Sequence, residues 1–161
     1  MKTGTTKDIM DRSELTLTPD LDIRTAMRTM LRANLNGAPV VDADGRLCGM
    51  LTEKDCLKSV VHQAVDGTPG GTVREYMTTD VRSVTPETQL LDVAHVFLTS
   101  VFRKLPVVDP EGRVVGQVSR RDILRAIVSA KDNSFLYGTK GHSPQAVEGV
   151  HSAMERARGK S

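Results

Sequence analysis

Apolar residues recur along two stretches of this chain with the period of an α-helix. Each stretch follows a Thr-Pro pair, and in each the apolar positions are spaced i, i+3, i+4, i+7 and i+8. They are Ile23, Ala26, Met27, Met30 and Leu31 in the first stretch, and Leu90, Val93, Ala94, Phe97 and Leu98 in the second. This spacing places the side chains on one stripe of a helix. We therefore expect an amphipathic helix in each stretch.

Two short β-rich runs follow each expected helix. In the first half of the chain the runs are residues 38–41 and 47–51, and Asp42-Ala43-Asp44-Gly45 separates them. In the second half they are residues 105–108 and 114–118. Asp and Gly between two β-rich runs favour a tight turn, so each pair of runs is expected to form a hairpin.

A second helix is expected after each hairpin, beginning near Thr52 in the first half. Its predicted inward face consists of Leu57, Val60, Val61 and Ala64. The corresponding helix of the second half carries Ile123, Leu124, Ile127 and Val128.

The two halves are copies of one another at a fixed offset. Asp122 lies 67 positions after Asp55 (122 − 55), and the same offset carries Pro39-Val40-Val41-Asp42 onto Pro106-Val107-Val108-Asp109. Two copies of this length indicate a duplicated αβ unit that folds as a pseudo-symmetric pair. The sequence predicts an α/β protein in which each repeat is a small sheet with a hairpin packed against two helices. The predicted divisions are a first repeat at 7–65, a linker at 66–72, a second repeat at 73–131 and a tail at 132–161 that contains helix signals.

Composition narrows the function classes. The net charge is +2, so no global field favours nucleic acid or an acidic membrane. No segment approaches the ~20 apolar residues of a membrane span, and the first residues do not fit a signal peptide. Cys48 and Cys56 have no C-x-x-C arrangement, and we expect reduced thiols in a cytoplasmic protein. The histidines share no metal spacing and no catalytic motif is present, so we expect neither a metal site nor an enzyme.

Two heptapeptides carry the candidate chemistry: GMLTEKD, ending at Asp55, and GQVSRRD, ending at Asp122. Thr52 and Ser119 are good helix N-caps, and an acidic residue three positions later completes the pattern of a capping box. The same geometry suits a ligand, because a helix start attracts anions and a carboxylate one turn in accepts hydrogen bonds from ribose hydroxyls. The two interpretations do not exclude each other.

These motifs, in fixed order and twice, resemble a tandem pair of CBS domains, the cystathionine-β-synthase-type repeats often called Bateman modules. The resemblance covers roughly residues 7 to 131. It implies a compact pair with two clefts at the pseudo-dyad, which in this family commonly bind adenosine-containing ligands. It also implies disc-like dimers.

The resemblance assigns roles to residues at the matching positions. Asp55 and Asp122 are expected to hold the ribose, and Thr52 and Ser119 to lie near phosphate. The positions expected to frame the base are Leu17, Thr18, Gly37, Ala38, Pro39, Val84, Thr85, Leu105 and Pro106.

The second copy is better supplied with cations than the first. Arg103, Lys104, Arg120 and Arg121 are the further candidates for phosphate binding, although a solvated basic face is the alternative interpretation. If only one site is occupied, we expect the ligand to depend on Asp122.

The sequence therefore predicts a stand-alone regulatory module that binds AMP, ADP, ATP, S-adenosylmethionine or NAD and requires no cofactor. We expect a homodimer that signals in trans to a separate effector protein through a conformational change. One alternative is a ligand-free dimerisation or scaffold protein. Another is a protein that binds single-stranded nucleic acid through the basic cluster of the second copy.

Overall fold

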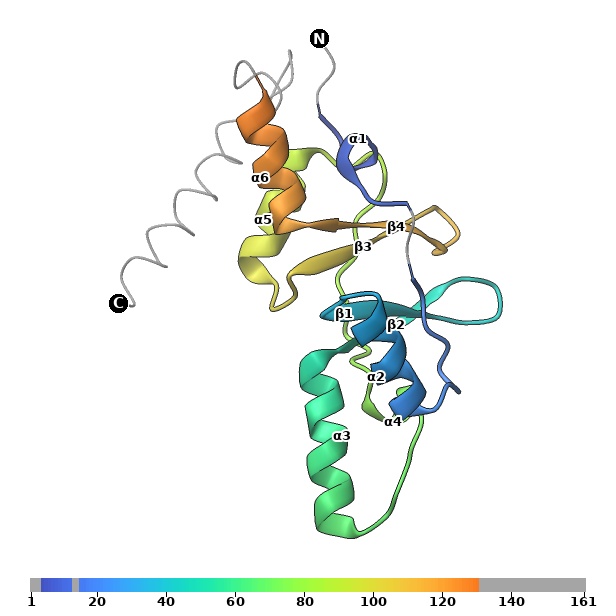
Figure 1. Cartoon of the computed structure of the whole chain (residues 1–161). Helices are drawn as coiled ribbons and strands as arrows, with labels where there is room; N and C mark the ends of the chain where they lie inside the picture. The colour runs from blue at the N-terminus through green and yellow to red at the C-terminus, as the bar shows by residue number, and fades with distance from the viewer. Residues whose placement is uncertain (1–3, 13–14, 131–161) are drawn as a thin grey trace. The chain divides into compact units, whose positions relative to one another are not determined.

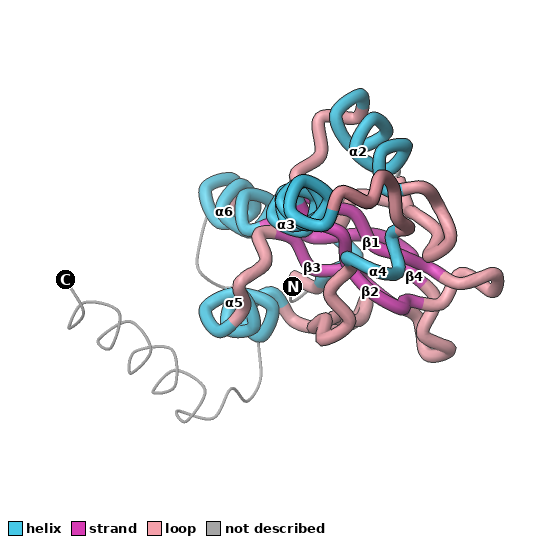
Figure 2. Tube along the Cα trace, turned by 90° about the horizontal axis from the view of Figure 1, so that it is seen from below, coloured by secondary structure: helices cyan, strands magenta, loops and turns pink. Residues whose placement is uncertain are grey.

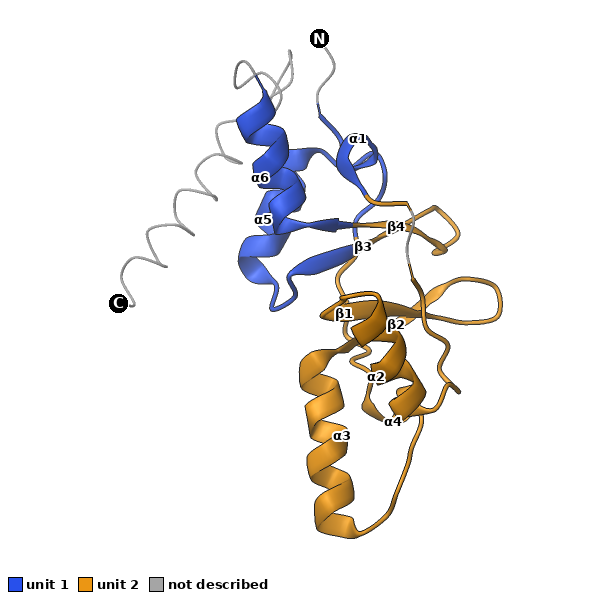
Figure 3. Ribbon diagram, viewed as in Figure 1, with its two compact units in different colours: residues 1–10, 84–105, 118–161 blue, residues 11–83, 106–117 orange. Residues whose placement is uncertain are grey.

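The structure, a computed structural model, describes residues 4–12 and 15–130 (Figure 1). The chain divides into two compact units (Figure 3). Unit 1 takes residues 1–10, 84–105 and 118–161, and unit 2 takes residues 11–83 and 106–117. The predicted tail at 132–161, with its helix signals, lies outside the described residues.

Unit 2 contains the hairpin and the two longer helices of the first repeat, together with one short helix of the second. Its elements are α2 (Ile23–Arg32), β1 (Gly37–Val41), β2 (Leu47–Thr52), α3 (Glu53–Asp66) and α4 (Val73–Tyr76). β1 pairs antiparallel with β2. In the turn between them, the backbone amides of Asp44 and Arg46 both donate to Asp42 Oδ1, each over 2.9 Å. The buried core consists of Leu17, Ile23, Ala26, Met30, Ala38, Val40, Leu51, Cys56 and Val73.

Unit 1 contains α1 (Thr6–Ile9), α5 (Leu90–Thr99) and α6 (Arg120–Ser129). β3 (Lys104–Val108) and β4 (Val114–Ser119) form the second two-stranded sheet, and both hairpins are visible in Figure 2. Residues 104–105 and 118–119 of this hairpin belong to unit 1. The mixture of helices with two small antiparallel sheets confirms the predicted fold class.

The short helix that begins each sequence repeat packs in the unit formed mainly by the other repeat: α1 lies in unit 1 and α4 in unit 2. In unit 1 the amide of Thr6, in α1, donates to the carbonyl of Thr88 over 2.9 Å. In unit 2 the amide of Val73, in α4, donates to the carbonyl of Leu21 over the same distance. Val73 lies 67 positions after Thr6, and Leu21 lies 67 positions before Thr88, so the two hydrogen bonds are equivalent under the repeat. The duplication therefore extends to contacts that join one sequence repeat to the other, and the compact units are not the sequence repeats.

The predicted inward face of α3 is wrong. Leu57, Val60 and Val61 are 66%, 52% and 62% exposed, and Ala64 is also exposed. The buried residues of this helix are Asp55, Cys56 and Ser59. The start of α3 packs on the core through this smaller and more polar face, so the apolar stripe is left at the surface of unit 2.

The corresponding prediction for α6 is only partly right. Ile123 is 4% exposed and packs inward, but Leu124 and Val128 are 61% and 85% exposed. The spacing of apolar residues shows which face of a helix could be buried, but it does not show which part of the protein, if any, packs against that face. Exposed apolar stripes of this kind are typical of interaction surfaces.

Candidate functional site

The first heptapeptide forms the start of α3. Thr52 is the N-cap, and its Oγ1 accepts a hydrogen bond from the amide of Asp55 over 3.2 Å. Asp55 Oδ2 accepts in return from the amide of Thr52 over 3.0 Å and from its hydroxyl over 2.9 Å. The capping box is therefore complete, with an aspartate reaching back where Glu or Gln is usual.

Asp55 has further partners within unit 2. Thr78 Oγ1 lies 3.3 Å from Asp55 Oδ1 and 3.4 Å from Oδ2, and it donates to this carboxylate. Lys58 Nζ lies 3.9 Å from Oδ1. The Asp55 side chain is only 4% exposed. Its charge is thus satisfied by internal donors, as a buried carboxylate requires.

The sequence did not indicate Thr78. It follows α4, and its amide and carbonyl pair with those of Met50 on β2 over 2.9 Å. This pairing brings its hydroxyl to the start of α3. A threonine directly after a methionine carries no local signal for such a contact.

The second heptapeptide forms the start of α6 with the same cap but a more accessible carboxylate. The amide of Asp122 donates to Ser119 Oγ over 3.1 Å, and the amide of Ser119 donates to Asp122 Oδ2 over 2.7 Å. Asp122 Oδ1 accepts from Arg125 over 3.2 Å. The Asp122 side chain is 22% exposed and that of Arg125 is 73% exposed, so this partner is a surface ion pair.

The four cations predicted to meet phosphate occupy different environments. The Arg120 side chain donates to the carbonyls of Ser100 and Phe102 over 3.4 and 3.3 Å, and its guanidinium carbon lies 5.9 Å from the centre of the Phe97 ring. It therefore stabilises the loop that follows α5. The other three are Arg103 and Arg121, which are exposed, and Lys104, which is half-buried.

The base-framing positions of the first copy lie together in unit 2. The amide of Leu17 donates to the carbonyl of Pro39 over 2.9 Å, which places residues 17 and 18 beside β1. Gly37, at the start of β1, is the register partner of Thr52. Ala38 is buried, as are Leu17, Gly37 and Pro39. The residues predicted around the first motif are therefore neighbours.

The equivalent positions of the second copy divide between the units. Val84 and Leu105 are buried in unit 1, where Thr85 is exposed. The amide of Thr85 donates to Thr88 Oγ1 over 3.0 Å in the turn before α5. Pro106 is buried and is counted with unit 2.

The thiols do not form a reactive centre. Cys48 and Cys56 are free. Burial raises the pKa of Cys56, and the nearby charges of Asp55 and Glu53 raise it further. Burial and then Asp42 raise the pKa of Cys48. Both thiols are thus less nucleophilic than an ordinary cysteine at neutral pH.

Residues 4–12 and 15–130 offer neither a metal site nor a membrane-spanning helix. No group of three or more His, Cys, Asp or Glu side chains in these ranges is arranged to hold a metal ion. None of the helices in the same ranges has the length and apolar character needed to span a membrane.

Comparison with known proteins identifies the family of the chain. The model of the CBS domain family matches residues 7–62 and, a second time, residues 73–129. The chain belongs to the CBS-domain family. The resemblance inferred from the repeated motifs is therefore confirmed.

Proteins from other organisms are similar over most of the chain. An uncharacterized 17.7 kDa protein of Acidianus ambivalens is 33% identical over 117 residues, which are 73% of this chain and 69% of that protein. The CBS-domain pair of protein MJ0100, solved with 5′-methylthioadenosine and S-adenosyl-L-methionine, is 28% identical. It has a TM-score of 0.69 over 79% of this chain and 98% of that chain.

CBSX2 of Arabidopsis thaliana, solved with AMP, is also 28% identical. It has a TM-score of 0.71 over 80% of this chain and 99% of that chain. The ligands named in these two structures all contain adenosine or its methylthio derivative.

Proposed function

We propose that this CBS-domain pair is a regulatory module that binds an adenosine-containing ligand, and that its second heptapeptide carries the binding. The observation that supports this choice is the contrast between the two carboxylates. The Asp55 side chain is 4% exposed and hydrogen-bonded to Thr78, whereas Asp122 is 22% exposed and shares its second oxygen with a surface arginine. The adenosine ligands of two similar CBS-domain structures support the ligand class.

The proposed role of Asp122 follows from the division of its oxygens. Oδ2 holds the cap, so Oδ1 is the atom that accepts from ribose hydroxyls. Oδ1 must first exchange its hydrogen bond with Arg125, and exposed ion pairs contribute only about 0–1 kcal/mol. The exchange therefore costs little.

Phosphate groups would be held by the start of α6 and by nearby cations. Ser119 supplies a hydroxyl, and the positive end of the α6 helix dipole attracts negative charge. Of the four predicted cations, Arg103, Lys104 and Arg121 are assigned to phosphate. Arg120 is assigned to the loop after α5, because its guanidinium already donates to two backbone carbonyls.

The module is proposed to act as a homodimer. In unit 2 a groove of about 310 Å³ lies between α2 and α3, lined mainly by apolar residues: Met27, Met30, Leu31, Leu35, Glu53, Cys56 and Leu57. Leu31 and Leu57 at its edge are 76% and 66% exposed. A second copy of the chain is the proposed occupant. The ligand would then act in trans by changing how a separate effector protein is bound.

Calorimetry with AMP, ADP, ATP, S-adenosylmethionine and NADH tests the ligand site. The variants are Asp122→Asn and, as a matched control, Asp55→Asn, since both remove one charge at the same position of a capping box. We expect Asp122→Asn to weaken binding by about tenfold or more, because a charged acceptor is lost. Asp55→Asn should lower stability and change affinity by less than about threefold.

Two results would contradict the proposal. Equal binding to all three proteins would show that the site is elsewhere. No binding of any of these compounds would favour a ligand-free scaffold.

A further inference from the structure

Three arginines form a row along α2, the longer helix at the start of the first repeat (Figure 1). Arg24, Arg28 and Arg32 are spaced i, i+4 and i+8, and all three are exposed. Residues at this spacing lie one turn apart on the same side of a helix, with about 5–6 Å between neighbouring Cβ atoms. These three residues are called the arginine row below.

The arginine row has no internal counterion. In the part of the chain that the structure describes, none of its guanidinium groups forms an ion pair or hydrogen bond with another side chain. The acidic residues just before α2 already have partners. Asp22 accepts from the amide of Thr25 over 3.2 Å, and Asp20 lies 3.5 Å from Arg74. The charge of the row is therefore open to a binding partner.

The row works against the stability of the helix that carries it. Like charges at i and i+4 destabilise a helix, and the helix dipole disfavours a cation near the N-terminus. Arg24 is the second residue of α2, so both effects act on it. Stability of α2 alone thus gives no reason for these three arginines.

The second repeat shows that the fold does not need the row. α5 buries the face equivalent to that of α2, through Leu90, Val93 and Phe97. At the offset of 67, however, the three arginines are replaced by Leu91, His95 and Thr99. The same helix is therefore built without a basic face, which indicates that the row serves binding rather than folding.

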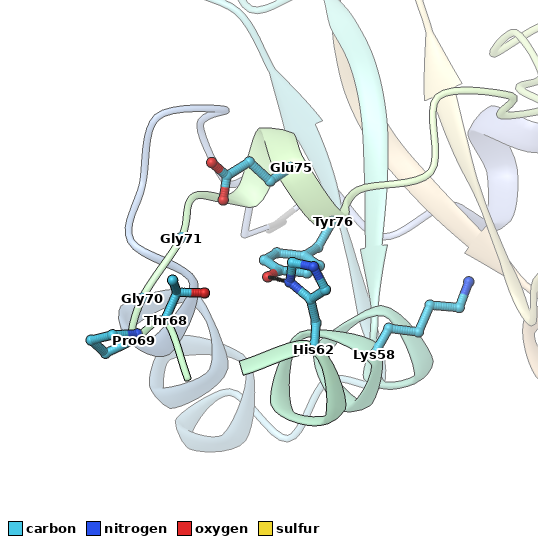
Figure 4. A pocket seen from close by; sticks show the side chains of 8 residues that line it. All are labelled: Lys58, His62, Thr68, Pro69, Gly70, Gly71, Glu75 and Tyr76. Atoms are coloured by element: carbon cyan, nitrogen blue, oxygen red, sulfur yellow. Dashed lines mark hydrogen bonds between the residues drawn. The ribbon is translucent and has the colours of Figure 1, made fainter. Parts of the chain in front are cut away.

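The cavity of unit 2 drawn in Figure 4 has no comparable bias toward one sign of charge. Its lining includes Lys58 and Glu75, and His62, which also lines it, lies 2.7 Å from Asp66. Charges of both signs meet there, so they select no class of ligand. The arginine row, which carries one sign only, does select one.

We propose that the arginine row binds an acidic α-helix of a partner protein, one that carries Asp or Glu at i, i+4 and i+8. A guanidinium binds a carboxylate through two parallel hydrogen bonds, and carboxylates at this spacing match the row turn for turn. The inference rests on the proposed action in trans only in identifying this partner with the effector. Binding of the helix itself requires no nucleotide.

Two other polyanions fit the surface less well. A membrane surface is disfavoured because the apolar face of α2 is buried and cannot insert between lipids. A nucleic acid is disfavoured because α2 has no aromatic residue on which bases could stack. A nucleic acid strand would also continue past the row toward Asp20 and Asp22, which are both exposed. The net charge of the chain, +2, is smaller than the charge of the row alone, so no wider field attracts a polyanion.

Nuclear magnetic resonance of the full-length chain tests the proposal with two alanine-rich helical peptides. One carries three glutamates at i, i+4 and i+8, and the other has the same composition with its glutamates on different faces. We expect the first peptide to shift the amide signals of α2 with a Kd on the order of 1 mM at low salt, and the second to bind about threefold more weakly or worse.

Variants locate the contact on the row. Arg28→Gln should weaken binding of the first peptide by about threefold, and replacement of all three arginines by glutamine should abolish saturation. Arg46→Gln is the matched control, because it removes an exposed arginine from the turn between β1 and β2 of the same unit. It should leave the affinity unchanged. All of these side chains are exposed, so circular dichroism should show unchanged thermal midpoints.

Several outcomes would overturn the proposal. Equal binding of the two peptides would mean that the row does not recognise spacing, and binding that survives the triple substitution would place the contact elsewhere. Stronger binding of a short oligothymidylate, or of vesicles that contain phosphatidylserine, would make the row a surface for phosphate groups instead. An AMP titration of the same samples reports on the nucleotide site alone, so its failure is distinguishable from the failure of the row.

Discussion

The buried carboxylate of Asp55 predicts that Thr78→Val destabilises the protein. Valine has nearly the same shape as threonine, so the substitution removes the hydroxyl that donates to Asp55 over 3.3 and 3.4 Å without opening a cavity. Hydrogen bonds to charged groups contribute about 1.5–3 kcal/mol, and these distances exceed the usual ~2.5–3.0 Å of an O–H···O bond, so a smaller contribution is expected. We therefore expect the free energy of unfolding to fall by about 1–2 kcal/mol.

Urea denaturation followed by circular dichroism measures this loss. Thr79→Val is the matched control, because Thr79 is the adjacent threonine and is exposed. It should change the free energy of unfolding by less than about 0.5 kcal/mol.

A double-mutant cycle identifies the partner of the hydroxyl. In an Asp55→Asn background, Thr78→Val should cost less than in the wild type, because the charged acceptor is gone. If Thr78→Val costs no more than Thr79→Val, or costs the same in both backgrounds, then Thr78 does not stabilise the carboxylate and the contrast between the two heptapeptides loses its basis.

Three further substitutions or measurements test other parts of the structure. Arg120→Ala should lower stability by about 1 kcal/mol in thermal unfolding, because two carbonyls lose their donor, whereas Arg121→Ala should change it little. Gly71→Ala should destabilise by about 2 kcal/mol or more, and Gly67→Ala by about 1 kcal/mol, because of these two glycines only Gly71 combines a positive φ with atoms closer than 3.0 Å to the added Cβ. Equal losses of stability in the two variants would argue against close packing of Gly71 on Glu75 and Tyr76. Cys56, whose pKa is raised by burial, should react with iodoacetamide more slowly at pH 8 than an unfolded-chain thiol, and an equal rate would contradict that environment.

The local elements could be predicted from the sequence because their signals are local. The runs at 38–41 and 47–51 correspond to β1 and β2 with differences of one residue, and the expected helix start near Thr52 is the observed start of α3. Turn residues, caps and apolar spacing act within a few positions of one another, so a single sequence is enough to predict the elements that they specify.

The exchange of α1 and α4 between sequence repeats has no local signal. Thr6 meets Thr88 and Val73 meets Leu21, through backbone groups that every residue possesses. Periodicity in a short segment specifies a buried face but not the unit that buries it. The same limitation explains α3, where the most apolar stripe is exposed and Asp55 is buried.

The difference between the two carboxylates was partly visible in the repeat. Met50 pairs through its backbone with Thr78, and Gln117 pairs with Asp11, so the two pairs are equivalent at the offset of 67. Thr78 therefore supplies a hydroxyl donor where the other pair has the carboxylate of Asp11. An ionised aspartate only accepts hydrogen bonds, so it cannot replace this donor. Comparing the copies for such non-equivalent residues would have indicated that the two motifs differ, although the contact itself depends on the strand register.

In the proposed function, capping and ligand binding would use different oxygens of the same side chain. In both heptapeptides Oδ2 accepts from the backbone of the N-cap residue, over 3.0 Å at Thr52 and 2.7 Å at Ser119. A ribose hydroxyl could therefore bind only to Oδ1 without breaking the cap. At Asp55 the Thr78 hydroxyl contacts Oδ1 inside unit 2, whereas at Asp122 its donor is a surface arginine that water can replace. On the proposed function, the donor to Oδ1, more than the motif itself, would decide which copy binds the ligand.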